Sequence, residues 1–183
     1  MTAAVLFGGG CFWCIEPAFS ALKGVSLSQA GYSGGTTPYP TYEQVCSQKT
    51  GHIEVVQVRY DSDVIDFETL LKVFFSLHDP TTLDRQGHDI GSQYASAIFY
   101  TTAEQQNQAA AYIKKLEEKL QKPVVTKLQP AQVFWPAEPE HYNYYLNNSF
   151  APYSVNVIQP KLRAFMKNFE PLIKDPREAL KKT

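Results

Sequence analysis

The chain has 183 residues, enough for one domain with a sizeable core, and a formal net charge of −1. Hydrophobic residues make up 44% and charged residues 19%, an ordinary balance for a soluble globular protein. The near-neutral charge gives no basic field that would indicate a nucleic-acid or membrane partner, and no apolar run reaches the ~18 residues of a membrane-spanning helix. The N-terminus lacks signal-peptide features and the chain has only three cysteines, so we expect a cytoplasmic protein rather than a secreted disulfide framework.

The chain opens with a predicted strand, a glycine turn and a helix. The apolar run 3–7 is typical of a short buried strand, and the glycines 8–10 let the backbone turn sharply before Cys11. Because Pro17 is tolerated only in the first turn of a helix, we predict that the regular helix begins near Cys14. Cys11 would then lie near free backbone N–H groups and the positive end of the helix dipole, which favours its thiolate.

The later elements alternate between strands and helices. In chain order we predict a strand over 25–32, a long ordered loop over 33–50, a strand over 53–60, a helix capped by Asp66, a polar loop over 87–93, a strand over 94–100, a helix with a Thr102–Gln105 capping box that Pro123 stops, a short strand over 124–128, and helical pieces near 139–147 and 159–168. This order predicts an α/β fold in which helices cover a sheet.

Two side chains suggest chemistry. Glu54 shares a strand face with Val56, Val58 and Tyr60. A carboxyl on such an apolar face loses solvation, so its pKa rises and it can hold and donate a proton at neutral pH. The alternative is that Glu54 lies at the end of the strand and reaches water. The alternative for Cys11 is a cysteine packed as a small hydrophobe, which the glycines and aromatic residues crowding the same loop disfavour.

Aromatic and polar residues gather in the same loops. Phe12 and Trp13 follow the cysteine, Tyr42 lies in the long loop, and Asp89 and Tyr94 lie in or next to the second loop. Tyrosine hydroxyls suit a polarised neutral oxygen, and aromatic rings suit an apolar methyl or thioether group. Because the chain has 11 tyrosines, a core residue with a satisfied hydroxyl is the competing interpretation for each of them.

Several short blocks occur in a characteristic order between Gly10 and about Tyr145. They are Gly10-Cys11-Phe12-Trp13, Gly31-Tyr32-Ser33-Gly34-Gly35, Pro40-Thr41-Tyr42, Gly51-His52-Ile53-Glu54-Val55-Val56, Asp84-Arg85-Gln86-Gly87-His88-Asp89-Ile90-Gly91-Ser92-Gln93-Tyr94, then Phe134, Ala137-Glu138 and His141. Together they resemble the peptide methionine sulfoxide reductase A family. The resemblance implies a two-layer α/β sandwich with a mixed sheet, a ferredoxin-like plait, that reduces methionine S-sulfoxide, free or within proteins, to methionine.

The resemblance also implies the roles of two central residues. Cys11 matches the nucleophile that attacks the sulfoxide sulfur, and Glu54 matches the acid that protonates the sulfoxide oxygen. A sulfoxide sulfur is a poor electrophile until its oxygen is protonated, so this role agrees with the buried position expected for Glu54. The attack releases methionine and leaves a sulfenic acid on Cys11.

The surrounding residues match a binding site for the sulfoxide. By resemblance, Tyr42 and Tyr94 hydrogen-bond the sulfoxide oxygen. Phe12 and Trp13 form the aromatic walls around the S-methyl group, and Asp89 is a substrate-positioning carboxylate. We expect a single catalytic domain over 1–183, in which residues 148–183 form a C-terminal extension that wraps the surface.

The sulfenic acid needs a resolving thiol. Many relatives use a cysteine in a C-terminal tail, but this chain has none after Cys46, and Ser154 stands where some relatives place one. We therefore expect Cys14 to form a disulfide with Cys11. The first helical turn must loosen for this, because residues three apart on a helix keep their Cβ atoms about 5–6 Å apart and a disulfide needs roughly 3.5–4.5 Å. Cys46 and an external thiol are the alternatives.

By resemblance the reductant is thioredoxin, with glutaredoxin or another thiol as an alternative, and no cofactor or metal is expected to be bound. The substrates would be free methionine sulfoxide and proteins that contain it. We expect a monomer that binds neither nucleic acid nor membranes.

Two other interpretations compete with this one. A thioredoxin-like disulfide oxidoreductase also places C-x-x-C after its first strand, but bulky Phe12 and Trp13 between the cysteines argue against it. A zinc module would need the ligands Cys11, Cys14, Cys46 and His52. We disfavour it because structural zinc pairs usually lie in knuckle turns rather than at a glycine-rich strand-to-helix turn.

Overall fold

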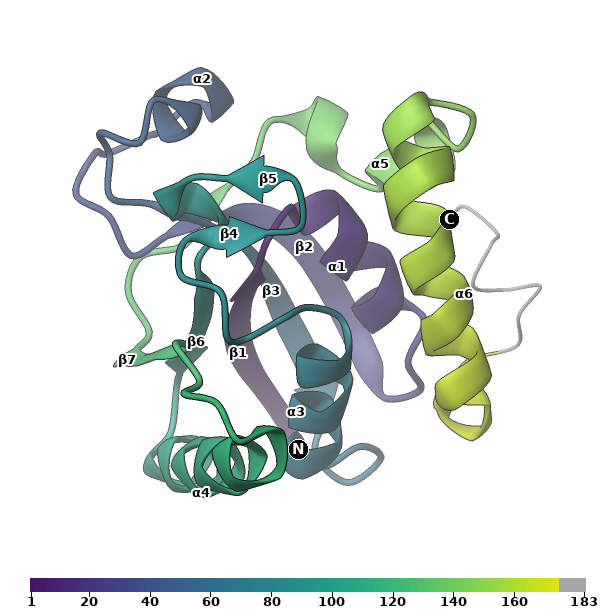
Figure 1. The fold of residues 1–183 in the computed structure, drawn as a ribbon. Coiled ribbons are helices and arrows are strands. Elements are labelled where there is room, and N and C mark those ends of the chain that lie inside the picture. The colour runs from purple at the N-terminus through teal and green to yellow at the C-terminus, as the bar shows by residue number, and fades with distance from the viewer. Residues whose placement is uncertain (175–183) are drawn as a thin grey trace.

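The structure is a computed structural model that describes residues 1–174 (Figure 1). Within this range, the main sheet has six strands in the order β7-β6-β1-β3-β2-β8. The strands are β1 (Thr2–Gly9), β2 (Val25–Ser33), β3 (Ile53–Asp61), β6 (Ser96–Tyr100), β7 (Lys127–Pro130) and β8 (Trp135–Pro136). Neighbouring strands are antiparallel except for β6 and β7, which are parallel, so the sheet is mixed as predicted.

The four central strands form a ferredoxin-like plait. They are connected as β1-α1-β2-β3-α3-β6 and lie in the order β6-β1-β3-β2, with every neighbouring pair antiparallel. Helices α1 (Phe12–Ser20) and α3 (Phe67–Ser76) lie on the same side of this sheet (Figure 1). Each helix buries its apolar side against the strands, which confirms the predicted two-layer α/β sandwich.

Stacked phenylalanines lock β1 to both helices. The ring of Phe7 on β1 lies 5.0 Å from that of Phe19 on α1 and 4.6 Å from that of Phe74 on α3, measured between centroids. All three side chains are fully buried. Because aromatic side chains contribute large buried areas, this stack holds the end of β1 rigidly just before the glycine turn.

Helix α1 begins earlier than predicted. Its first residue is Phe12, Cys11 is the N-cap, and Pro17 lies inside the helix. The prediction that the helix starts near Cys14 is therefore wrong. In so short a helix Pro17 removes one backbone hydrogen bond, while Phe12 and Ile15 are almost completely buried and hold the first turn in place.

Two segments predicted as loops contain short regular elements. Residues 33–50 include α2 (Tyr42–Cys46), which begins with a complete capping box between Thr41 and Gln44. The second predicted loop, 87–93, contains β5 (Asp89–Ile90), which pairs with β4 (Arg85–Gln86) just before the loop. Local hydrogen bonds form these short elements within each segment, and α2 lies away from α1 in the view of Figure 1.

Other boundaries also differ from the predictions. A 3₁₀ turn spans Ser92–Tyr94, so β6 starts at Ser96 rather than Tyr94, and β7 lies about two residues beyond its predicted position. Helix α4 (Ala103–Leu120) is capped by the Thr102 side chain, which accepts from the Gln105 backbone N–H at 3.1 Å. The Gln105 side chain donates to Tyr60 Oη at 3.0 Å instead of completing a capping box, because it is buried between α4 and the sheet.

The C-terminal region wraps around α1. It contains a 3₁₀ turn at Pro139–His141, α5 (Tyr144–Asn147), a π-helical turn at Ser154–Ile158, α6 (Gln159–Asn168) and a 3₁₀ turn at Glu170–Leu172. The backbone N–H of Lys23 donates to Leu172 O at 2.8 Å, and that of Lys174 donates to Ala21 O at 2.9 Å. Residues 148–174 thus lie along the helix that carries the cysteines; the rest of the predicted extension, 175–183, lies outside the described residues.

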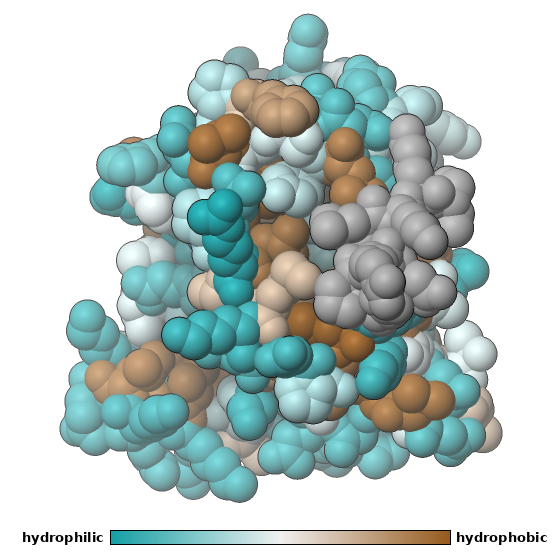
Figure 2. Space-filling view, turned by 90° about the vertical axis from the view of Figure 1, so that its right-hand side faces the viewer, coloured by the Kyte–Doolittle hydropathy of each residue, from teal (hydrophilic) through white to brown (hydrophobic). Residues whose placement is uncertain are grey.

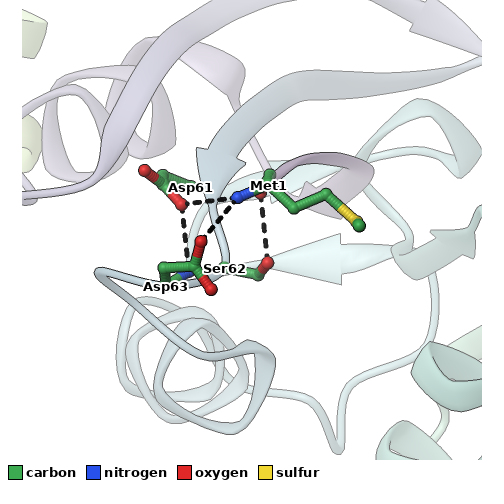
Figure 3. A network of polar contacts seen from close by, with 4 residues as sticks. All are labelled: Met1, Asp61, Ser62 and Asp63. Atoms are coloured by element: carbon green, nitrogen blue, oxygen red, sulfur yellow. Dashed lines mark hydrogen bonds and ion pairs between the residues drawn. The ribbon is translucent and has the colours of Figure 1, made fainter.

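The chain's first residue is tied to the end of β3. The Met1 amino group lies 3.0 Å from a carboxylate oxygen of Asp61 and 2.9 Å from one of Asp63, and Ser62 contacts the Met1 carbonyl (Figure 3). These groups are exposed, so the ion pairs contribute little to stability. Their position agrees with the pairing of β1 and β3, in which Thr2 lies opposite Asp61.

The surface beside α6 mixes hydrophobic and hydrophilic residues. Figure 2 shows separate hydrophobic groups surrounded by hydrophilic side chains on this side of the molecule. Isolated hydrophobic residues of this kind are normal on protein surfaces. Among residues 1–174, no helix combines the length and apolarity needed to cross a bilayer.

Candidate active site

Cys11 lies directly between the glycine turn and α1. Gly10 has a φ of 93°, and a Cβ at this residue would lie 2.8 Å from Cγ of Gln86. Only glycine combines this left-handed backbone with such a close approach. The turn thereby directs the chain from β1 into α1 and leaves Cys11 at the helix N-terminus, with 8% of its surface exposed.

The two cysteines of the first turn interact. Burial raises the pKa of the Cys11 thiol well above its ordinary value, and a hydrogen bond to Cys14 and the charge of Glu54 add to this rise. The same hydrogen bond lowers the pKa of Cys14. The expectation of a resting Cys11 thiolate is therefore wrong for this closed site, because desolvation outweighs the helix terminus. Cys11 rests as a thiol, and Cys14 is the more acidic partner.

Glu54 is a buried carboxyl at the start of β3. Only 1% of its surface is exposed, so the alternative in which it reaches water is wrong. Its Oε1 accepts from the Phe12 backbone N–H at 3.2 Å, while its Oε2 has no partner. Burial raises the pKa of Glu54 to about 8, although the Phe12 hydrogen bond opposes the rise. At neutral pH the site therefore holds a protonated acid with one oxygen available to a ligand.

An aromatic wall surrounds the first turn of α1. Phe12 is fully buried and lies 5.7 Å from Tyr32 between ring centroids, whereas Trp13 is partly buried. Tyr144 stacks on Trp13 with a centroid distance of 3.7 Å and an interplanar angle of 8°. The Trp13 indole N–H donates to His141 Nδ1 at 3.1 Å, which fixes the ring in its plane. These contacts make a rigid apolar surface beside Cys11.

Glu138 connects this wall to α2. Its carboxylate accepts from the Tyr32 hydroxyl at 3.2 Å and from the Tyr42 backbone N–H at 3.2 Å. The same carboxylate lies 3.5 Å from Nε2 of His141. Because His141 Nδ1 accepts from Trp13, its Nε2 carries the proton and faces Glu138. Glu138 thereby holds three segments that are distant in the sequence.

The two tyrosines predicted to bind an oxygen both remain protonated. Burial raises the pKa of Tyr42 and of Tyr94, and in each case the charge of Glu54 adds to the rise. Cys11 has the same effect on Tyr94. Both hydroxyls therefore stay neutral near pH 7 and can donate hydrogen bonds to a neutral oxygen.

Asp89 reaches the site through a residue that the sequence analysis did not assign. Tyr153 donates from its hydroxyl to Asp89 Oδ2 at 2.7 Å, and the same hydroxyl lies 3.7 Å from Cys14 Sγ. Sequence reasoning also missed Tyr144 and gave His141 no role. The only signal for these residues was the aromatic density of the stretch 141–153, which cannot by itself separate site tyrosines from core tyrosines.

Cys46 and His52 do not join a four-ligand cluster with the other cysteines. Both ring nitrogens of His52 are engaged within its own loop, Nδ1 with the Gly35 backbone N–H at 3.0 Å and Nε2 with Thr37 O at 2.7 Å. All three cysteines are free thiols, and Cys46 is partly exposed on α2. The zinc-module interpretation is therefore wrong about His52, which instead stabilises the loop before β3.

Glu54 is a protonated carboxyl, and it lies beside the buried thiols of Cys11 and Cys14. This arrangement suits a reductase that protonates an oxygen of its substrate while a thiol attacks the atom that carries the oxygen. The fold and the site therefore define a thiol-based oxidoreductase built on a ferredoxin-like plait. Comparison with known proteins identifies its family.

Residues 3–172 match the sequence model of a family described as peptide methionine sulfoxide reductase. The chain is 48% identical to the peptide methionine sulfoxide reductase MsrA of Saccharolobus solfataricus, over 91% of this chain and 94% of the relative. It is 51% identical to the MsrA of Chromobacterium violaceum, over 96% of this chain and 100% of the relative.

Solved structures show the same similarity. Methionine sulfoxide reductase A of Corynebacterium diphtheriae aligns with a TM-score of 0.74 at 34% identity, covering 82% of this chain and 78% of that one. Mxr1 of Saccharomyces cerevisiae in its reduced form aligns with a TM-score of 0.75 at 28% identity, covering 82% and 87%. The chain belongs to the peptide methionine sulfoxide reductase A family and is a peptide-methionine (S)-S-oxide reductase.

Proposed function

We propose that Cys11 attacks the sulfur of methionine S-sulfoxide while Glu54 protonates the sulfoxide oxygen. The observation that carries this proposal is the state of Glu54: it is buried, has a pKa raised to about 8, and keeps Oε2 without a partner. Its other oxygen is bound to the backbone N–H of Phe12, the residue that follows Cys11. An acid in this position can protonate a ligand oxygen next to the attacking sulfur.

The remaining residues supply binding and orientation. Tyr42 and Tyr94 donate hydrogen bonds to the sulfoxide oxygen, and Phe12 and Trp13 pack against the S-methyl group. Asp89 positions the rest of the substrate. Free methionine sulfoxide and sulfoxide-containing proteins would both present this same small group to the site.

The first half-reaction balances without a cofactor. A bond forms between Cys11 Sγ and the sulfoxide sulfur while Glu54 protonates the sulfoxide oxygen. The S–O bond of the substrate and the new S–S bond then both break as the protonated oxygen becomes bonded to Cys11 Sγ. The proton of the Cys11 thiol replaces the one that Glu54 has given. The products are methionine and a Cys11 sulfenic acid.

In the second half-reaction, Cys14 attacks the sulfenic acid and forms a disulfide with Cys11 as water leaves. Cys11 is the N-cap of α1 and Cys14 lies in its first turn, where the Cys14 backbone N–H donates to Cys11 O at 3.1 Å. An external dithiol then reduces the disulfide. The structure of yeast Mxr1 in complex with Trx2 makes thioredoxin the reductant to test first, with glutaredoxin second.

The decisive experiment uses separated S and R epimers of an N-acetylated methionine sulfoxide with a dithiol reductant. We expect turnover of the S epimer only, its loss in Cys11→Ser, and its retention in the matched control Cys46→Ser. Turnover of both epimers, or activity in Cys11→Ser, would refute the proposed roles. Peptide mapping after one turnover without reductant then distinguishes a Cys11–Cys14 link from a Cys11–Cys46 link or an unresolved sulfenic acid.

We also expect one catalytic unit that acts as a monomer in a reducing, cytoplasmic compartment. Sedimentation of the reduced protein at several concentrations tests the monomer. A mass that rises with concentration would contradict it.

A further inference from the structure

A short chain of polar contacts leads from Cys14 to the partly exposed Asp89. The Tyr153 hydroxyl donates its proton to Asp89 Oδ2 at 2.7 Å. Cys14 Sγ lies 3.7 Å from the same hydroxyl oxygen. Because the hydroxyl proton is already used by Asp89, the oxygen offers its lone pairs to the Cys14 thiol, which acts as the donor.

Packing holds the Tyr153 hydroxyl in this position. The ring of Tyr153 meets that of Trp13 edge to face, with centroids 5.7 Å apart and planes at 75°. The next residue, Ser154, is fully buried at the start of the π-helical turn that leads into α6. Cys14 itself is only 5% exposed, so bulk water cannot easily collect its proton.

The proposed resolution step requires that this proton leave. Cys14 reacts as a thiolate, and its neighbour Cys11 cannot accept a proton usefully once it carries the sulfenic acid. The Tyr153 hydroxyl contacts Cys14 and is also hydrogen-bonded to the carboxylate of Asp89. A tyrosine placed between a donor and a carboxylate can accept one proton while it gives up another.

We propose that the Tyr153 hydroxyl accepts the proton of the Cys14 thiol and passes its own proton to Asp89 as Cys14 attacks the Cys11 sulfenic acid. This inference rests on the proposed function with Cys14 as the resolving thiol. It assigns to Tyr153 a role in disulfide formation, separate from reduction of the sulfoxide.

The step balances. A bond forms between the two Sγ atoms, and the S–O bond of the sulfenic acid breaks. The leaving hydroxide takes the proton of Glu54 and becomes water, while the proton from Cys14 ends on Asp89. Asp89 then exchanges with solvent and Glu54 is reprotonated, so one sulfenic acid and one thiol give one disulfide and one water. The Cys14 sulfur is oxidised and the Cys11 sulfur is reduced.

The electrostatics agree with a concerted transfer. Burial raises the pKa of Tyr153, so a free tyrosinate is not stable there. The hydroxyl must therefore lose its proton to Asp89 as it gains one from Cys14.

The test is a single turnover of Tyr153→Phe without reductant, which removes the hydroxyl and keeps the ring against Trp13. Released methionine reports the first step, and the protein disulfide and dimedone-trapped sulfenic acid report the second. We expect disulfide formation slowed on the order of tenfold to a hundredfold relative to methionine release in the same variant, with accumulated sulfenic acid. Tyr145→Phe, on α5 in a pocket with Pro17 and Leu162, is the matched control with unchanged rates.

Disulfide formation at the wild-type rate in folded Tyr153→Phe overturns the relay. Asp89→Asn is a second test, because the amide oxygen can still accept the Tyr153 hydrogen bond but cannot take up its proton. Slow disulfide formation after methionine release in this variant supports the relay. Failure of the wild-type protein to release methionine would instead refute the proposed function. Methionine release without a Cys11–Cys14 disulfide would refute Cys14 as the resolving thiol and the relay with it.

Discussion

Glu54 owes its chemistry to where the sheet places it. It lies on β3 beside the turn that carries Cys11, and its Oε1 bonds the Phe12 backbone while Oε2 is unpartnered. The buried environment disfavours the carboxylate, which keeps the proton on the side chain at neutral pH. The same burial that prepares an acid also makes its ionisation unfavourable for the folded state.

Glu54→Gln separates these two effects. Without a proton to donate, kcat/KM for the S-sulfoxide should fall by about 10²–10⁴-fold, and in the wild type it should decline as pH rises through about 8. Because the folded pKa is raised above the unfolded value, the contribution of Glu54 to stability is present at low pH and lost as pH rises through the folded pKa. The variant lacks this loss of up to about 1.4 kcal/mol per pH unit.

Urea unfolding between pH 5 and 9, performed on both proteins, measures the second effect. The free energy of unfolding of the wild type should fall relative to that of Glu54→Gln as pH increases. Parallel curves would show that Glu54 is ionised in the folded protein.

At the scale of elements, a buried histidine joins α3 to two strands. His78 follows the C-terminus of α3, and its Nδ1 lies 2.8 Å from Phe74 O. Its Nε2 lies 2.7 Å from Ser96 Oγ on β6, which in turn lies 2.7 Å from Thr126 Oγ1 just before β7. Nδ1 therefore carries the proton of a neutral ring, and burial lowers the pKa of His78 to about 4.

This neutral histidine makes stability depend on acid pH. The unfolded chain binds a proton at His78 near pH 6.5 and the folded chain does not until about pH 4. The stability that His78 contributes is thus present above 6.5 and lost as pH falls towards 4, by about 3 kcal/mol in total. Chemical unfolding from pH 7 to 4 should show this loss in the wild type and in the exposed control His88→Gln, and a smaller loss in His78→Gln. Equal losses in all three proteins would contradict it.

At the scale of the whole molecule, the C-terminal region fastens the helix that carries the thiols. Phe165 of α6 is almost fully buried, and an isolated bridge pairs Leu22 with Ile173 beyond it. The region also supplies His141, Tyr144 and Tyr153 to the site. The active site is therefore closed by residues that lie far from Cys11 in the sequence.

Phe165→Ala should weaken the packing of α6 against the rest of the domain. Removing a buried aromatic ring costs about 3–5 kcal/mol of unfolding free energy through lost contacts and the cavity that remains. Thermal unfolding should show a clear drop in midpoint, with none for the exposed control Lys167→Ala. An unchanged midpoint in Phe165→Ala would mean that α6 packs independently of the domain's stability.

Sequence patterns were enough to predict the local features of this protein. Strand and helix periodicity predicted most elements, and alternation along 53–60 placed Glu54 on an apolar face. The turn predicted at glycines 8–10 is made by Gly10 alone, because Gly8 and Gly9 continue β1. The ordered blocks between Gly10 and about Tyr145 were enough to indicate the family. These features depend on residues close together in the chain, so short-range patterns are enough to find them.

The pKa values and side-chain contacts of the site depend on how the whole chain folds. The pKa of Cys11 rises rather than falls because distant segments bury it, an effect that no local pattern contains. The start of α1 at Phe12 and the contacts of Tyr153 with Cys14 and Asp89 likewise depend on packing between segments far apart in the chain. Burial and long-range hydrogen bonding arise from the complete fold, so these properties appear only when all the segments are assembled.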